Sequence, residues 1–173
     1  NCTDLEEELL DETLTGAQAE VISGAIAPAY GQVSWTWRHT NYYGLTLIPS
    51  DEAILPYRGG SDWFDGGKFL AAHNHNMTPT NDWVDSGWNE LTKDISRTLS
   101  AIEVLTPLAE EGDTVAADAL YEMKALRAYL NMLLLDGWGL VLQKESAEEL
   151  SVVLRSQEAI DYIEGELLSV VDV

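Results

Sequence analysis

The chain has 173 residues, of which 46% are hydrophobic, so it is long enough to bury the core of one domain and is not a disordered sequence. Its 30 Asp and Glu against 9 Lys and Arg give a formal net charge of -21. This charge excludes nucleic-acid binding, because phosphate contacts require Lys and Arg, and it disfavours adsorption to anionic lipid.

The one cysteine is Cys2, which rules out an intramolecular disulfide and a cysteine cluster for zinc. Its position leaves two interpretations. It is either a free thiol at a frayed end or the lipid-bearing residue of a processed bacterial lipoprotein, followed by the acidic segment "TDLEEELLDE". On the second interpretation residues 1–15 form a lipid-anchor leash, since no hydrophobic run reaches the length of a membrane span.

A helix is predicted from Gly16, because apolar residues then recur at helical spacing. Thr15 is the expected N-cap, and Pro28 is expected to kink or end the helix. The residues of its apolar side are Ala17, Val21, Ile22, Ala25, Ile26 and Tyr30.

Residues 31–87 are expected to form long loops around one or two short helices, because no strand-like alternation persists there. The segment holds three of the five Pro and all three His, and five of the six Trp lie in it or directly beside it. A loop region of this length in a compact domain usually carries function.

Three further helices are predicted at 88–111, 114–136 and about 155–171. Gly112 and Asp113 end the first of these helices and cap the second, so these two helices must lie antiparallel. The last helix is expected to turn Ile160, Ile163, Leu167 and Val170 to one face. The predicted fold is mainly α, with tetratricopeptide-like helical hairpins and long loops between the first and second helices, although no sequence repeat of fixed period is present.

Catalysis is not expected. Glycoside hydrolysis needs two carboxylates across a cleft, and Asp51, Glu52, Asp62 and Asp65 supply enough, but acidic residues are too frequent in this chain for their presence to discriminate. No serine lies in a Gly-x-Ser-x-Gly elbow, and the only cysteine is terminal. We predict a protein that is not an enzyme and that needs no cofactor.

A metal site is a weaker alternative. His73 and His75 could share a zinc ion with Asp82 or Asp85 as a third ligand, but no third ligand has a fixed spacing, so hydrogen bonds to backbone are the favoured role. Asp62 and Asp65 could approach calcium, but the regular ladder of oxygen ligands is missing.

The tryptophans suggest sugar binding, because indole faces stack on pyranose rings while Asn, Asp and Arg bond the hydroxyl groups. Trp35, Trp37 and Trp88 are expected to fill space between loops and helices, Trp88 being in phase with the apolar face of its helix. For Trp63 and Trp83 sugar stacking and gap filling are equally supported.

Four stretches, read in order, resemble the amino-terminal part of the SusD and RagB family of outer-membrane lipoproteins from Bacteroidetes-type bacteria. They are "SDEAILPYRGGSDWFDGG", "WNELTKDISRTLSAIEVL", "EMKALRAYLNMLLLDGWG" and "EAIDYIEGELLSVV". The resemblance covers the chain from about Cys2 to Val171, and its most specific element is "ALRAY" in the helix that ends in "LLLDGWG".

The resemblance implies that residues 16–173 are a SusD-like amino-terminal helical domain within a longer architecture, with Cys2 lipidated on the outside of the outer membrane. It implies capture of oligosaccharides for a SusC-like TonB-dependent transporter. The site residues carried over are Arg58, Asp62, Asn81 and Trp83, with Trp63 beside them and Asp82 in the same segment. Arg127 of "ALRAY" is assigned to the scaffold, where it ties neighbouring loops through carboxylates or carbonyls.

Two alternatives remain open at this point. The chain could be a structural element that docks on the transporter and has no ligand site of its own, or its cargo could be a peptide.

Overall fold

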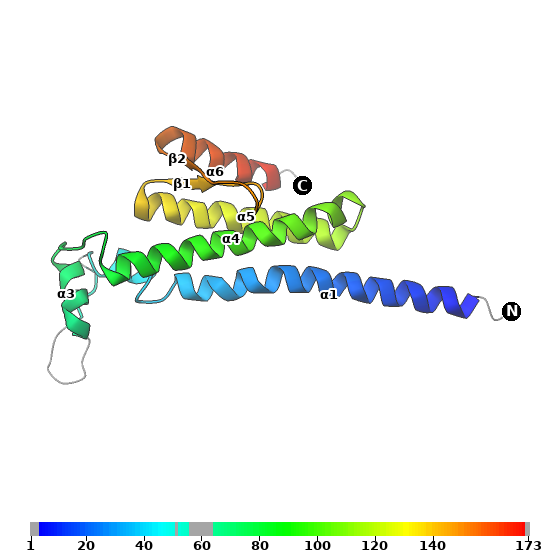
Figure 1. The fold of residues 1–173 in the computed structure, drawn as a ribbon, viewed down its shortest axis with the longest axis horizontal. Helices are drawn as coiled ribbons and strands as arrows, with labels where there is room; N and C mark the ends of the chain where they lie inside the picture. Colours follow the sequence, from blue (N-terminus) through cyan, green and yellow to red (C-terminus); the bar gives the residue numbers. More distant parts are fainter. Residues whose placement is uncertain (1–3, 51, 56–63, 172–173) are drawn as a thin grey trace.

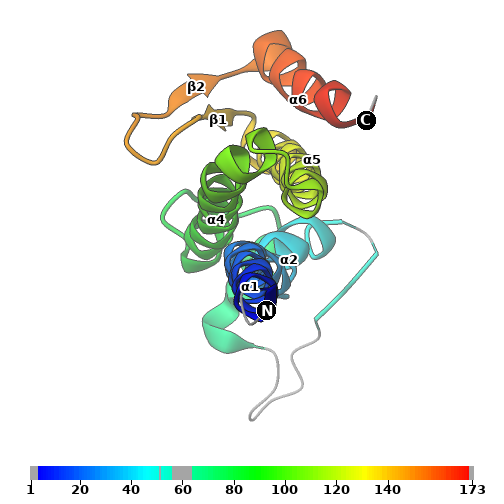
Figure 2. The ribbon, with the colours of Figure 1, turned by 90° about the vertical axis from the view of Figure 1, so that its right-hand side faces the viewer.

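The computed structural model describes residues 4–50, 52–55 and 64–171. They are mainly helical, which confirms the prediction of a mainly α fold. The elements, in order, are α1 (Asp4–Thr36), α2 (Tyr42–Leu47), the 3-10 turn η1 (Asp65–Gly67), α3 (Lys68–His73), α4 (Asp82–Glu110), α5 (Thr114–Trp138), β1 (Val141–Gln143), β2 (Val152–Leu154) and α6 (Ser156–Val171). The long helices follow one another across the molecule in the order α1, α4, α5, α6 (Figures 1 and 2).

Helices α4 and α5 form an antiparallel hairpin, as predicted from the break between them (Figure 1). Gly112 takes a φ of 96°, and the Asp113 side chain accepts hydrogen bonds from the backbone N–H groups of Val115 and Ala116. The two helices bury Leu91 and Ile95 against Leu130 and Leu134, so their central turns make one apolar core.

Helix α1 lies along α4 and is longer than predicted (Figure 1). It begins at Asp4, so Thr15 is inside the helix and is not its cap, and it continues through Pro28 to Thr36. Pro28 removes the helical hydrogen bond to the carbonyl of residue 24. That residue is the exposed Gly24, whose carbonyl can bond water instead, and this explains why the helix does not end there.

Residues 37–81 connect α1 to α4 through short helices, as expected. This region has a small core of its own. It consists of Ile48, which directly follows α2, Phe69 and Ala72 of α3, and Trp83 at the start of α4. The expectation that loops continue to residue 87 is wrong, because α4 already begins at Asp82.

The carboxyl-terminal part packs on α5. Strands β1 and β2, which the sequence did not predict, pair antiparallel with Val141 opposite Leu154. Arg127, 3% exposed, donates to both carboxylate oxygens of Glu166 at 2.6 and 2.8 Å, to Glu145 and to the carbonyl of Lys144. This confirms its scaffold role, since one side chain joins α5 to α6 and to the β hairpin.

The buried face of α6 differs from the predicted one. Ala159 and Ile163 are buried, whereas Ile160 and Leu167 are exposed. The ion pair of Glu166 with Arg127 turns the Glu166 side of α6 toward α5, and this leaves Ile160 and Leu167 on the outer side. An apolar stripe is therefore exposed on α6, made up of Ile160, Leu167, Leu168 and Val171.

Candidate functional site

An open depression lies where the first turns of α4, the last turn of α5, helix α2 and residues 77–79 meet. It consists of two adjoining hollows of about 430 and 310 Å³, which share Met77, Val84 and Trp138. The further lining residues are Thr78, Pro79, Asp85 and Trp88 in one hollow and Tyr42, Leu45, Thr46, Asp136 and Gly137 in the other. We call this the aromatic depression.

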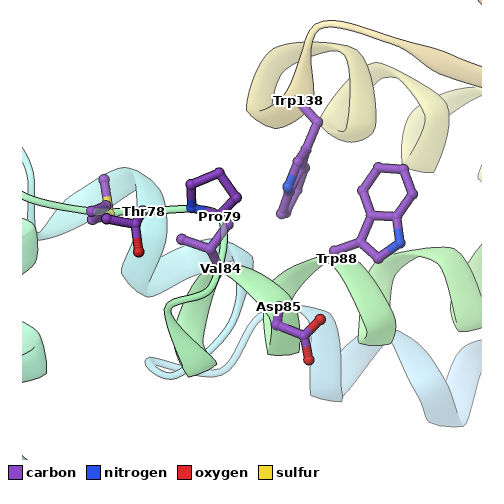
Figure 3. A pocket seen from close by; sticks show the side chains of 7 residues that line it. Thr78, Pro79, Val84, Asp85, Trp88 and Trp138 are labelled. Atoms are coloured by element: carbon purple, nitrogen blue, oxygen red, sulfur yellow. The ribbon is translucent and has the colours of Figure 1, made fainter.

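Two indoles form its central wall. The ring centroids of Trp88 on α4 and Trp138 on α5 are 5.8 Å apart, and the ring planes meet at 68°. Figure 3 shows the two side chains extending toward each other from their helices, with Pro79 and Val84 beside them. Aromatic rings at this angle form a corner whose faces point in different directions.

Two glycines place Trp138 in this corner. A Cβ atom on Gly87 would meet Cη2 of Trp138 at 3.3 Å, so the absence of a side chain there lets the indole lie close against α4. Gly139 caps α5 with a φ of 68° and so ends the helix directly after the tryptophan.

A phenol and a carboxylate supply polar groups on the α2 side. The hydroxyl of Tyr42 donates to a carboxylate oxygen of Asp136 at 2.8 Å. Burial, and next the hydrogen bond to Asp136, raise the pKa of Tyr42 above its ordinary value, so the phenol stays protonated and remains a donor. Asp136 itself is exposed and can accept further hydrogen bonds.

Asp85 lies at the rim of the other hollow. It is one helical turn before Trp88 on α4, on the side away from Trp138 (Figure 3). One of its oxygens accepts a hydrogen bond from the Asn89 side chain at 2.9 Å, and the residue is exposed. The depression therefore combines an apolar aromatic wall with acceptor groups on two sides.

The predicted stacking residue Trp83 is not in this site. Its side chain is 2% exposed and packs edge-on against Phe69, with ring centroids 5.1 Å apart. It is in the first turn of α4, whose N-cap is Asn81, and the Asn81 side chain accepts a hydrogen bond from the backbone N–H of Trp83 at 3.1 Å. The prediction of a sugar contact at Trp83 is corrected accordingly, because its indole faces are covered by the core.

Four other predicted residues lie outside the described residues: Cys2, Arg58, Asp62 and Trp63. The same holds for Asp51, which was considered as a carboxylate partner.

Trp35 and Trp37 were expected to fill gaps, but they are 44% and 39% exposed. The guanidinium of Arg38 lies over the Trp35 ring, 3.3 Å from its centroid, and Trp37 contacts the rings of Tyr42 and Tyr43. Only Trp88 of the three tryptophans assigned to packing is partly covered by the core between α4 and α5.

The histidines show no metal arrangement. His73 ends α3, and His75 follows it with a φ of 56°. Within residues 4–50, 52–55 and 64–171, no three His, Cys, Asp or Glu side chains form a group that could hold a metal ion.

Sequence reasoning missed Trp138, Tyr42 and Asp136. The signal for Trp138 and Asp136 was present in "LLLDGWG", where an aspartate and a tryptophan flank the end of a helix. Their position beside Trp88 follows from the antiparallel hairpin, in which the end of α5 returns to the start of α4 (Figure 1).

In the part of the chain that the structure describes, none of the helices combines the length and the apolar character needed to cross a membrane. Comparisons of the chain with protein-family models, with curated proteins and with solved structures find no match.

Proposed function

We propose that this chain is a cell-surface glycan-binding lipoprotein, anchored in the outer membrane through lipid on Cys2, that captures oligosaccharides for a SusC-like TonB-dependent transporter. On this proposal it is a member of the SusD and RagB family with tetratricopeptide-like hairpins, and its role is to bind rather than to react with its cargo.

The observation that carries the proposal is the corner of Trp88 and Trp138 in an open depression. Pyranose rings present apolar C–H faces that pack on indoles, and their hydroxyl groups need acceptors and donors around the rim. Asp85, Asp136 and the hydroxyl oxygen of Thr46 supply acceptors here, and the Thr46 proton is itself donated to the backbone carbonyls of Tyr42 and Tyr43. The collinear sequence resemblance independently favours the same class of protein.

Isothermal titration against a panel of neutral and charged oligosaccharides, with peptides of similar size, tests the proposal. We expect binding to at least one oligosaccharide, and we expect Trp138→Ala to weaken it about tenfold, which corresponds to loss of roughly 1.4 kcal/mol. The matched control is Trp35→Ala, which removes an exposed indole that does not line the depression and should leave the affinity unchanged.

If the protein binds peptides and no oligosaccharide, its cargo is a peptide and not a sugar. If no oligosaccharide binds, and if the protein in its natural length does not co-purify with a barrel transporter from outer membranes, the proposal is wrong.

A second candidate function is docking without a ligand site, and the exposed apolar stripe of α6 favours it. Ile160, Leu167, Leu168 and Val171 are exposed on one side of a helix whose other side is packed on α5. Apolar stripes of this kind often mark interfaces.

The double substitution Leu167→Ser and Leu168→Ser separates the two candidates. If it abolishes co-purification with the transporter while Trp138→Ala changes neither assembly nor any ligand affinity, docking is the function. The reverse result supports glycan capture.

A further inference from the structure

The charged residues that line the aromatic depression are all acidic. Among the described lining residues these are Asp85 and Asp136, and none is a Lys or Arg. Both side chains are exposed, and each carboxylate accepts a hydrogen bond from an uncharged group, Asn89 or Tyr42. Among the lining residues that the structure describes, the site therefore presents negative charge that no Lys or Arg offsets.

Aromatic rings add to this preference. The face of an indole or phenol carries negative electrostatic potential, and it attracts an ammonium group placed within about 6 Å of the ring centroid. Trp88 and Trp138 meet in a corner of the same depression, which Tyr42 and Asp136 line on one side and Asp85 borders at the rim. Two rings at 68° allow a ligand to pack its apolar face on one indole while an ammonium group lies over the other.

One cation is held directly after the end of α5, outside the lining of the depression. Arg155 donates to the backbone carbonyl of Gly139 at 3.3 Å, and Gly139 directly follows Trp138. Its guanidinium is held by that carbonyl, and it is not among the residues that line either hollow. Removal of Arg155, a positive charge close to the end of α5, is therefore a test of the charge argument.

We infer that the aromatic depression takes an amino sugar with a protonated amine, an oligosaccharide of the glucosamine type, in preference to a neutral one. This inference rests on the proposed function, since it names the class of glycan that the same site binds. The ammonium group pairs with Asp136 or Asp85 and with an indole face, while the pyranose rings stack in the corner. An anionic sugar is disfavoured by the same charges.

The experiment compares three β-1,4-linked oligosaccharides of equal length that differ in the substituent at C2: a free amine, an acetylated amine and a hydroxyl group. Isothermal titration at low and at raised salt measures each affinity. We expect the free amine to bind about tenfold more tightly than the other two, and this advantage should shrink as salt screens the exposed charges.

Four variants locate the effect. Asp136→Asn and Asp85→Asn should each reduce, about threefold, the ratio of the affinity for the free amine to the affinity for the neutral sugars, and Arg155→Gln should increase that ratio. The matched control is Asp118→Asn, which removes the same charge from an exposed position of α5 outside the depression. It should change no affinity.

The outcomes separate the two proposals. If neutral sugars bind as tightly as the free amine, and Trp138→Ala weakens both, glycan capture stands and the preference for an amine is overturned. If Asp118→Asn reduces amine binding as much as Asp136→Asn does, the attraction belongs to the whole acidic surface and the inference is also overturned.

If none of the three oligosaccharides binds while a neutral sugar of another linkage does, the inference about the amine fails and glycan capture stands. If no oligosaccharide binds at all, the proposed function fails with it.

Discussion

The hydroxyl of Thr36 donates to a carboxylate oxygen of Asp94 at 3.2 Å, across the interface between the last turn of α1 and the middle of α4. Both residues are 0% exposed, and the second oxygen of Asp94 has no hydrogen-bond partner within the described residues. An acidic side chain is thus buried with one hydrogen bond at the place where α1 is attached to the α4–α5 hairpin. Beside it, Gln32 donates to Glu90 at 2.6 Å.

Burial raises the pKa of Asp94 from its ordinary value to about 7, against the opposing effects of the Thr36 hydrogen bond and of Arg97, with Glu90 adding to the rise. The folded state therefore binds this proton more tightly than the unfolded chain does. The stability that the protonated carboxyl contributes is lost as the pH rises from about 4 to about 7. Above about pH 7, Asp94 causes no further change in the free energy of unfolding.

Asp94→Asn should therefore stabilise the protein at about pH 8, by about 1 to 2 kcal/mol, because the amide keeps an acceptor for Thr36 without a buried charge. Near pH 4 the two proteins should be almost equally stable. Urea unfolding at both pH values measures the difference, with Asp118→Asn as the exposed control. A variant that is less stable than the parent at about pH 8 would contradict the burial of a charged carboxylate.

Arg127 holds the carboxyl-terminal part to α5, and its loss should be costly. Arg127→Ala leaves Glu166, with a side chain 13% exposed, without its partner, and breaking a buried ion pair in this way costs about 3 to 5 kcal/mol. The control is Lys93→Ala, which removes a surface ion pair with Glu90 and should cost less than about 1 kcal/mol. Denaturant unfolding of both variants is the measurement, and equal losses would show that Arg127 is not the link we infer.

Gly44 of α2 lies against the backbone of the preceding turn, where there is no room for a side chain. An added Cβ would lie 1.8 Å from the carbonyl oxygen of His39, a backbone atom that cannot turn away as a side chain does. Gly44→Ala should destabilise the protein by about 2 kcal/mol or more. Gly165→Ala is the control, since nothing lies within 4 Å of its Cβ and the helix should gain about 0.5 to 1 kcal/mol. A melting temperature that rises for both variants would contradict the close approach at Gly44.

Gly87→Ala should affect the aromatic depression more than stability. Its Cβ would lie 2.6 Å from Cδ1 of Leu45, a flexible end that can yield, and 3.3 Å from Cη2 of Trp138. The indole must then shift, which should change the near-UV circular dichroism and weaken ligand binding about threefold, while the free energy of unfolding changes by less than about 1 kcal/mol. An unchanged spectrum would mean that Gly87 does not position Trp138.

The hairpin of α4 and α5 was predictable because its signals are local. Apolar spacing defines both helices, and Gly112 with Asp113 marks the turn in two adjacent residues. The role of Arg127 was also predictable, because a cation in an apolar helix must find acceptors nearby. Only the turn between the helices is determined by adjacent residues, whereas the partners of Arg127 lie 17 to 39 positions later in the chain.

The start of α4 was missed although its signal is local too. Asn81 is a good N-cap. Asp82 and Asp85 are acidic residues in the first turn, where their negative charge interacts favourably with the positive end of the helix dipole. Reading these as polar loop residues placed Trp83 in a loop, and so as a candidate ligand contact. As a first-turn residue it points into the core against Phe69.

The aromatic depression itself could not be predicted from local signals. It needs the end of α5 to return beside the start of α4, and it needs α2 to bring Tyr42 against Asp136, 94 positions later in the chain. The two three-residue strands were missed for a related reason, because only their pairing across an eight-residue connection distinguishes them from loop.

Helix α1 gives the proposed anchoring a geometric consequence. Its 33 residues form one continuous helix, which at about 1.5 Å per residue is roughly 50 Å long. Tyr42 and the rest of the aromatic depression lie near its carboxyl-terminal end, while Cys2 precedes its amino-terminal end (Figure 1). If a lipid is attached at Cys2, helix α1 would lie between the anchor and the proposed site, and its length would limit how far from the membrane a sugar is first caught.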